Sequence, residues 1–267
     1  MLVRKPAVAG LFYPDSNDEL QAYLKSAIKP VEEKISPVAI IVPHAGYIYS
    51  GATAASVYSL IESFDTYLIF GPNHTGLGAD ISLFDGIYEM PFGEVMPDSE
   101  LIEKIAKGEY VEIDYYAHLQ EHSIEVQLPF IDYISEGDYR IASIVVGTHN
   151  VAKLYSTAET IAKAIKEHNR SVLMVVSSDM NHYEDQNTTL IKDNKAIEAM
   201  KNLDENELLR VTQAEGITMC GVGSAYIAIA AAKMLGAKRF VEVDHRTSGE
   251  VNGDFDKVVG YLSAYIE

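Results

Sequence analysis

Four short apolar runs, each followed directly by a loop that carries a histidine, constrain the fold of this chain most strongly. The four pairs of run and loop are Val38–Val42 with Pro43-His44, Tyr67–Phe70 with Gly71–His74, Ile141–Val146 with Gly147–His149, and Val172–Val176 with Ser177–His182. Apolar runs of this length are typical of strands buried on both faces. In an open α/β sheet, residues beyond the carboxyl ends of the strands line the crevice where ligands bind. The sequence therefore predicts a buried sheet with histidines along one edge.

Composition and charge narrow the class of protein. The chain has 267 residues, 48% of them hydrophobic, which predicts one large domain over residues 1–267. A formal net charge of −18 argues against binding to nucleic acid or to an anionic membrane surface. No apolar run is long enough to span a bilayer, and Met1–Gly10 lacks the core of a signal peptide. We expect a cytoplasmic protein whose partner is a small molecule, a metal ion or another protein.

Amphipathic segments alternate with the apolar runs, a pattern typical of an α/β fold with a largely parallel sheet covered on both faces. Asp204 and Glu207 have the spacing of a helix capping box. Phe240–His245 and Val258–Ile266 are predicted as the last strands, the second as an edge or half-exposed strand. The predicted helices are Gly51–Ser63, Asp98–Lys107, Val151–His168, Asp204–Ala214 and Gly223–Leu235.

Two strand-end histidines are framed by glycines. His44 lies in Pro43–Tyr47, and His74 lies in Gly71–Gly76, where glycines allow a tight turn after the strand. The two imidazoles are suited to bind one metal ion if they converge across the sheet edge. The alternative for His44 is a hydrogen-bonded histidine that holds a loop in place.

His122 lies in Glu121–Phe130, whose apolar residues have helical spacing. This is not the zinc-protease motif, because His118 and His122 are four residues apart without the internal glutamate. Two interpretations remain open: His122 faces the cleft as an acid, base or hydrogen-bond donor, or it belongs to a solvated helix start with Glu121 near the positive end of the helix dipole.

Asp179, His182 and Cys220 complete the set of candidate residues. Asp179 follows a buried strand and is expected to orient a histidine by accepting its ring proton, or to bind metal; the alternative is that Ser178 and Asp179 cap a turn. Cys220 is the only cysteine, so the chain forms no internal disulfide. A thiol at a helix N-terminus has its thiolate favoured by the dipole, which suits metal binding or redox chemistry. A small buried hydrophobe is the other interpretation.

Several reaction classes lack their motifs. There is no P-loop and no Gly-x-Ser-x-Gly elbow, which argues against phosphate transfer and ordinary serine hydrolysis. The histidines outside the motifs above, His118, His149, His168 and His245, are expected to be structural or solvated.

Taken together, the motifs closely resemble those of the Memo family, called AmmeMemoRadiSam system protein B in prokaryotes. The resemblance implies a three-layer α/β/α sandwich with a central, largely parallel but mixed sheet, similar to the LigB-type class III extradiol non-haem iron dioxygenases. It also implies a pocket lined by His44, His74, His182 and Cys220, with Asp179 and His122 close by. The matching motifs are Ala9–Tyr13, Pro43–Tyr47, Gly71–His74, Glu121–Glu125, Ser177–Asp179 with His182, and Cys220-Gly221.

In those dioxygenases two histidines and one carboxylate hold Fe(II). Here the match puts Cys220 in place of the carboxylate, and the softer thiolate favours copper(I), zinc or a redox role over extradiol cleavage. The resemblance therefore implies a metal-binding redox protein, with metal-dependent oxidoreductase activity as the expected enzyme class. The expected metal is iron or copper, and zinc is the other candidate. Its implied ligands are His44, His74 and Cys220. His182, Asp179 and His122 are implied either to surround these ligands or to act as acid and base groups.

The prokaryotic family name implies action together with a radical SAM protein and an AMMECR1-like protein. The alternative from another class of function is a non-enzymatic module that binds a peptide or small ligand in the same pocket.

Overall fold

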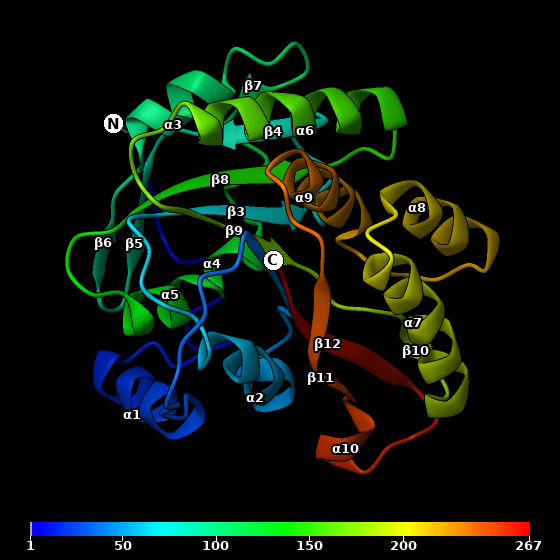
Figure 1. The fold of residues 1–267 in the computed structure, drawn as a ribbon. Helices are drawn as coiled ribbons and strands as arrows, with labels where there is room; N and C mark the ends of the chain where they lie inside the picture. Colours follow the sequence, from blue (N-terminus) through cyan, green and yellow to red (C-terminus); the bar gives the residue numbers. More distant parts are fainter. Residues whose placement is uncertain (1) are drawn as a thin grey trace.

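The structure, a computed structural model, describes residues 2–267. A nine-stranded mixed sheet runs through the molecule (Figure 1). In spatial order its strands are β10 (His182–Glu184), β12 (Val258–Ile266), β2 (Ala39–Val42), β9 (Val172–Ser177), β3 (Thr66–Pro72), β8 (Arg140–Val146), β4 (Ile81–Phe84) and β7 (Glu112–Ile113), with β11 (Phe240–Thr247) paired to β12. Strands β2, β9, β3 and β8 are parallel neighbours, so their carboxyl ends share one edge. A separate small sheet contains β1 (Val3–Arg4), β5 (Ile87–Met90) and β6 (Gly93–Val95).

Helices cover both faces of the large sheet, with α3, α6 and α9 on one side and α1, α2 and α5 on the other (Figure 1). None of the helices in residues 2–267 combines the length and the apolar character needed to cross a membrane. The helices are α1 (Asn17–Ala27), α2 (Tyr47–Tyr58), α3 (Ser99–Ile105), α4 (His122–Glu125), α5 (Leu128–Ile134), α6 (Val151–Lys166), α7 (Gln186–Lys201), α8 (Glu205–Ala214), α9 (Val222–Met234) and α10 (Gly249–Asn252).

The strands contribute alternate residues to two hydrophobic clusters, as the two-residue period of a strand requires. In β2, Ala39 and Ile41 pack into the cluster under α6 and α9, whereas Ile40 and Val42 pack into the cluster under α1, α2 and α5. All four side chains are fully buried. The predicted α/β class with three layers and a mixed sheet is therefore confirmed.

The four apolar runs form β2, β3, β8 and β9, as predicted. The predictions of α3, α6, α8 and α9 are confirmed within two residues at each end, and Asp204 caps α8 by accepting from the backbone N–H of Glu207. Helix α6 joins two parallel strands, β8 and β9, that lie on either side of β3.

Two predicted elements differ from the structure. Helix α2 was expected over Gly51–Ser63 but runs from Tyr47 to Tyr58. It begins earlier because Gly46 is the N-cap and the Tyr47 N–H donates to the carbonyl of Phe12, and it ends earlier because Ile61 forms a β-bridge with Ile35. Strand β12 was expected at an edge or half-exposed, but it is almost wholly buried between β2 and the pair β10 and β11. Its small residues Gly260 and Ser263 are buried as well. The alternation of large and small residues along this strand therefore does not mark alternating exposure.

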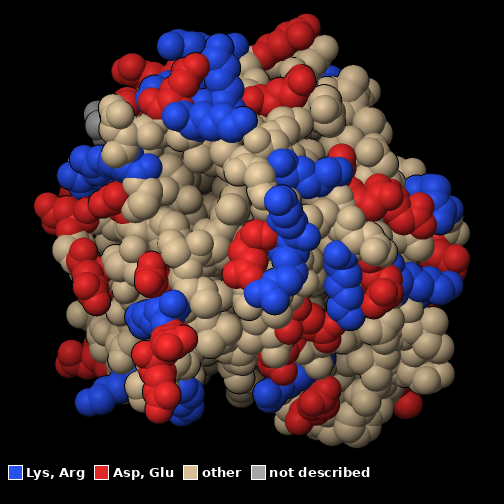
Figure 2. Space-filling view, viewed as in Figure 1, with Lys and Arg blue, Asp and Glu red and all other residues tan. Residues whose placement is uncertain are grey.

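Acidic and basic side chains are interspersed over the face of the molecule in Figure 2. The exposed pairs Lys195–Glu215 (2.8 Å) and Arg210–Glu207 (2.6 Å) are examples from the helical layer. Exposed pairs of this kind contribute about 0–1 kcal/mol each to stability. Stability therefore depends mainly on the two cores and on buried polar networks.

One buried network joins α3 to the sheet. Asp98 is the N-cap of α3 and accepts from the N–H of Leu101; its other oxygen accepts from the Thr66 hydroxyl (2.6 Å) and from Nε2 of His168 (3.0 Å). Burial on its own raises the pKa of Asp98, but these hydrogen bonds and the charge of His168 outweigh it and lower the pKa below its usual value. The ionised carboxylate therefore stabilises the folded state.

We predict that Asp98→Asn lowers the free energy of unfolding by about 1–3 kcal/mol at pH 7, because His168 loses an ionised partner. A pKa lowered by folding gives stability above the unfolded value of about 3.9, and this stability is lost as the pH falls through the folded pKa. Urea unfolding should therefore show a smaller difference between the two proteins at pH 3 than at pH 7. The control is Asp138→Asn, at an exposed loop position. Equal losses at both pH values would contradict this explanation.

Candidate metal centre

The parallel strands bring the predicted residues to one edge of the sheet. His44 follows β2 and His74 follows β3, while β9, which lies between these strands, leads to Asp179. His122 begins α4, and Cys220 precedes α9. They meet at a cavity of about 570 Å³. Its lining residues are Phe12, His44, Ala45, Gly46, His74, His122, Asp179, His182, Tyr183, Thr218, Cys220 and Val259.

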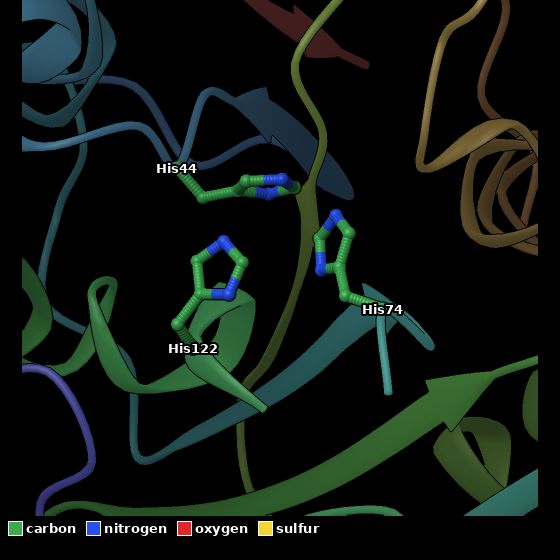
Figure 3. A group of neighbouring side chains, drawn as sticks. All are labelled: His44, His74 and His122. Atoms are coloured by element: carbon green, nitrogen blue, oxygen red, sulfur yellow. The ribbon is translucent and has the colours of Figure 1, made fainter. Parts of the chain in front are cut away.

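Three imidazole rings converge in this cavity: His44, His74 and His122 (Figure 3). One ring nitrogen from each lies within 4.8 Å of the others, so these three histidines are placed to hold a metal ion. The ring centroids of His44 and His74 are 5.2 Å apart, and the rings are nearly perpendicular. Two of the three predicted ligands, His44 and His74, are in this group, together with His122.

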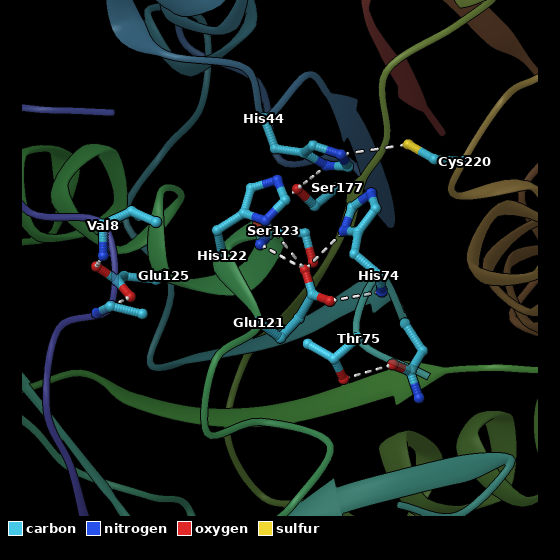
Figure 4. A network of polar contacts seen from close by, with 12 residues as sticks. Val8, His44, His74, Thr75, Glu121, His122, Ser123, Glu125, Ser177 and Cys220 are labelled. Carbon is cyan, nitrogen blue, oxygen red and sulfur yellow. Dashed lines mark hydrogen bonds and ion pairs between the residues drawn. The ribbon is translucent and has the colours of Figure 1, made fainter. Parts of the chain in front are cut away.

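Ser177 fixes the orientation of the His44 ring (Figure 4). The Ser177 hydroxyl donates its single proton to the carbonyl of Ser123 (2.6 Å) and accepts from Gln127 Nε2 (2.9 Å). Towards His44 Nδ1, 3.0 Å away, it can therefore only accept. His44 Nδ1 consequently carries the proton, and the lone pair is on Nε2, which lies 3.2 Å from the Cys220 sulfur. Burial, with the neighbouring histidines, lowers the pKa of His44 well below its usual value, so the ring is neutral.

Glu121 holds His74 in a similar way (Figure 4). One carboxylate oxygen accepts from His74 Nδ1 (2.8 Å), and the other accepts from the His74 backbone N–H (2.7 Å). Burial on its own raises the pKa of Glu121, but the hydrogen bond and charge of His74 outweigh it and lower the pKa to about 2. Carboxylates that accept the second N–H of a histidine are common around metal ligands. Burial on its own lowers the pKa of His74, but the hydrogen bond and charge of Glu121 outweigh it and raise the pKa above its usual value. Nε2 is the ring nitrogen available to a metal ion, which would displace its proton.

Glu121 was expected at a solvated helix start, and this part of the interpretation is wrong. The side chain does cap α4, accepting from the Ser123 N–H, but it is only 2% exposed. The sequence signal was a glutamate directly before His122 inside an apolar segment. The sequence contains no pattern that predicts the role of Ser177, because a serine at the end of a buried strand can bond to many different partners.

His122 differs from the other two rings because no hydrogen bond fixes it. Its Nδ1 is 3.6 Å from Glu121 Oε1, which is too long for a hydrogen bond. The ring stacks on His74, with centroids 4.6 Å apart, and contacts Phe12 at 4.9 Å. Burial lowers the pKa of His122. His122 therefore faces the cleft, as one of the two interpretations predicted.

Cys220 lies beside His44, with Sγ 3.2 Å from Nε2. The sulfur also accepts from the backbone N–H of Asp179 (3.3 Å). Burial, together with the charge of Asp179, raises the pKa of the Cys220 thiol above its usual value. This direction is opposite to the one expected for a helix N-terminus, because desolvation outweighs the dipole.

Asp179 was expected to accept a ring proton from a histidine, but it accepts the backbone N–H of His44 at 2.8 Å. The carboxylate thus holds the loop after β2 and not an imidazole. Burial raises the pKa of Asp179 to about 7, and the His44 N–H opposes this only in part. The expected cap role of Ser178 takes a different form, since its hydroxyl accepts from the Gly221 N–H (2.9 Å) and ties β9 to the start of α9.

His182 lies on the other wall of the cavity. Its Nδ1 donates to the carbonyl of Thr218 (3.0 Å), and its backbone N–H donates to the Thr218 hydroxyl (2.8 Å). Burial lowers the pKa of His182. Its Nε2 therefore carries the lone pair.

The remaining histidines lie outside the cavity, as expected. His118 and His168 are buried and hydrogen-bonded, to Ser82 and Asp98 respectively. His245 pairs with Asp193. His149 is exposed and follows β8, which lies one strand further from the site than β3.

Comparison with known proteins agrees with the motifs. The family model for Memo-like proteins matches residues 4–265. A MEMO1 family protein of Aquifex aeolicus is 46% identical over 98% of each chain, and one of Methanosarcina barkeri is 38% identical over 99% of this chain and 100% of its own. An uncharacterized protein of Escherichia coli K12 shares the fold, with a TM-score of 0.55 at 11% identity, over 84% of this chain and 98% of that protein. The chain therefore belongs to the Memo family.

Proposed function

We propose that the cavity binds a redox-active iron or copper ion, with His44, His74 and Cys220 as ligands. The observation that carries the proposal is that the Nδ1 atoms of His44 and His74 are bound to Ser177 and Glu121, so Nε2 is the nitrogen of each ring that is available to a metal ion. Histidines that bind metals almost always donate their second ring N–H in this way. The donor set of two imidazoles and a thiol fits copper, iron or zinc.

Cys220 is preferred over His122 as the third ligand for two reasons. The 3.2 Å separation of Cys220 Sγ and His44 Nε2 suits two ligands of one ion, since metal–sulfur and metal–nitrogen distances are about 2.3 and 2.0 Å. A metal ion also deprotonates a coordinating thiol, which overcomes its raised pKa. His122 makes no hydrogen bond that would orient it as a ligand. The triad His44, His74 and His122 is the competing ligand set, and its ring nitrogens all lie within 4.8 Å of one another, a group that does not include Cys220.

A bound iron or copper ion would supply one-electron redox chemistry and open positions for a substrate. His122 would accept a proton from the substrate, because its lowered pKa keeps the ring neutral and no hydrogen bond from residues 2–267 occupies its ring nitrogens. His182 presents Nε2 to the other side of the cavity as a second acceptor. Asp179 keeps the His44 loop in position.

The partners are part of the proposal. A radical SAM protein and an AMMECR1-like protein would act with this chain in the cytoplasm. Co-purification of the three proteins from a cell that encodes them tests this. A complex that survives size-exclusion chromatography supports it, and three separate peaks at micromolar concentration contradict it.

Anaerobic titration of chelator-treated protein with Fe(II), Cu(I) and Zn(II) tests the proposal. We expect one ion per chain for at least one of these metals, measured by calorimetry and elemental analysis. Absence of binding by all three would contradict a metal centre and favour the other candidate, a pocket that recognises a peptide or small ligand without turnover.

Glu121→Gln should weaken metal binding by about 10- to 100-fold, because the amide cannot accept both N–H groups of His74 with a full charge. The downfield imidazole N–H proton of His74 should disappear from the NMR spectrum at the same time. Glu103→Gln, at an exposed position on α3, is the matched control. Unchanged affinity in Glu121→Gln would show that Glu121 does not orient a ligand.

A further inference from the structure

Tyr183 has a left-handed backbone conformation, with φ of 62°. For a bulky residue this is a strained conformation. It is one of two residues other than glycine with a positive φ in residues 2–267, and the other, Leu203, lies away from the cavity in the loop after α7. Strain of this kind persists where surrounding structure enforces it and is concentrated at functional sites.

A β-bulge produces the strain. In the antiparallel pair of β10 and β12, His182 pairs with Val259 and Glu184 pairs with Val258, and the register shifts between them. Tyr183 is therefore the extra residue, without a partner on β12. Bulges beside binding sites turn a side chain in a new direction. Here the bulge directs Tyr183 to the cavity that holds the histidines.

The protein itself gains little from this side chain. Tyr183 is 72% exposed, and its hydroxyl makes no hydrogen bond with any described residue. Its contact with the neighbouring ring of His182, at 5.6 Å and 56°, is the only aromatic one found for it in residues 2–267. Neither burial nor hydrogen bonding offsets the backbone strain.

A second aromatic ring lines the same cavity from the N-terminal part of the chain. Phe12 contacts His122, as Tyr183 contacts His182. Both rings line the cavity together with the candidate metal ligands. The cavity thus combines polar groups suited to a metal and its substrate with two apolar ring faces.

We infer that Tyr183 is a specificity-determining residue that contacts the substrate, and that the substrate carries a flat, apolar ring or similar unsaturated group. This inference rests on the proposed function, because that proposal makes the cavity the substrate site. Flat groups stack on aromatic side chains with ring centroids 4.5–7 Å apart, whereas saturated rings of the same size do so less well. Contact with the substrate then offsets the backbone strain.

Stability measurements test the strain. Tyr183→Gly should raise the melting temperature by about 1–4 °C, because glycine adopts a positive φ without steric cost. Tyr183→Phe should leave the melting temperature within about 1 °C of the original protein, because phenylalanine has the same backbone strain at this position. A lower melting temperature for Tyr183→Gly would show that the side chain stabilises the fold and would overturn the inference.

Binding measurements on chelator-treated protein test the role in specificity. The probes are benzyl alcohol and cyclohexylmethanol, which differ in the flatness of the ring, and the readout is the movement of backbone NMR signals around the cavity. We expect benzyl alcohol to bind about two- to tenfold more tightly. Tyr183→Ala should reduce this preference, because Phe12 alone remains, and Tyr183→Phe should keep it. An equal preference in Tyr183→Ala, or none in the original protein, would overturn the inference. Because no metal is present, either result is independent of whether the metal proposal holds.

Discussion

Replacing His44 by alanine is expected to weaken metal binding by at least about a hundredfold, because even groups that only support a ligand change affinity by about 10- to 100-fold. His74→Ala should have an effect of the same size. Cys220→Ser should also weaken binding strongly, since a serine hydroxyl is a much harder donor than a thiolate. His122→Ala should keep the affinity within about tenfold, because His122 is assigned to proton transfer. Calorimetric titration of each apoprotein with the metal that binds the original protein provides the measurement.

His149→Ala is the matched control for these variants. His149 also follows a parallel strand of the sheet, but it is exposed and lies outside the cavity. Its replacement should leave both affinity and stoichiometry unchanged. If His122→Ala lost binding and Cys220→Ser kept it, the histidine triad would be the ligand set instead.

The largest expected effect on stability comes from Arg4, whose guanidinium is fully buried. It forms an ion pair with Glu125 and donates to the carbonyls of His118 (3.1 Å) and Glu121 (2.6 Å). Glu125 in turn accepts from the backbone N–H groups of Ala7 and Val8 and from the Tyr13 hydroxyl, so the network ties the N-terminal segment to α4; the contact with Val8 is visible in Figure 4. Arg4→Met leaves a buried carboxylate without its counter-charge.

We expect Arg4→Met to lower the free energy of unfolding by about 3–5 kcal/mol, the range for breaking a buried ion pair at one partner. Denaturant titration followed by circular dichroism measures it. Arg210→Met, which removes an exposed pair with Glu207, should cost no more than about 1 kcal/mol. A loss of that small size for Arg4→Met would contradict the idea that the network anchors α4 and, with it, Glu121 and His122.

The central strands and the edge that carries the site were predictable from sequence, because β2, β3, β8 and β9 are buried on both faces and therefore continuously apolar. The short strands β4 to β7 were not predictable. Their pairing depends on partners distant in the chain, such as Ser82 with Glu112, and two to four residues carry too little periodicity.

The predicted site residues His44, His74, His122, Asp179, His182 and Cys220 all line the cavity. What the sequence could not give was the direction of each side chain. The hydrogen bonds of Ser177 and Glu121 to the histidines arise from the spacing of β2, β9 and β3 and from the entry angle of α4, which only the folded chain defines. The raised pKa of Cys220 likewise follows from its burial, which its position before a helix did not reveal.

X-ray absorption spectroscopy of the protein loaded with the ion that it binds most tightly tests the central claim most directly. We predict two imidazole nitrogens at about 2.0–2.1 Å and one sulfur at about 2.3 Å from the metal, with the sulfur absent in Cys220→Ser. A first shell of nitrogen and oxygen alone in the original protein would contradict the thiolate ligand and assign the centre to His44, His74 and His122. A spectrum without imidazole scattering would contradict the metal centre itself.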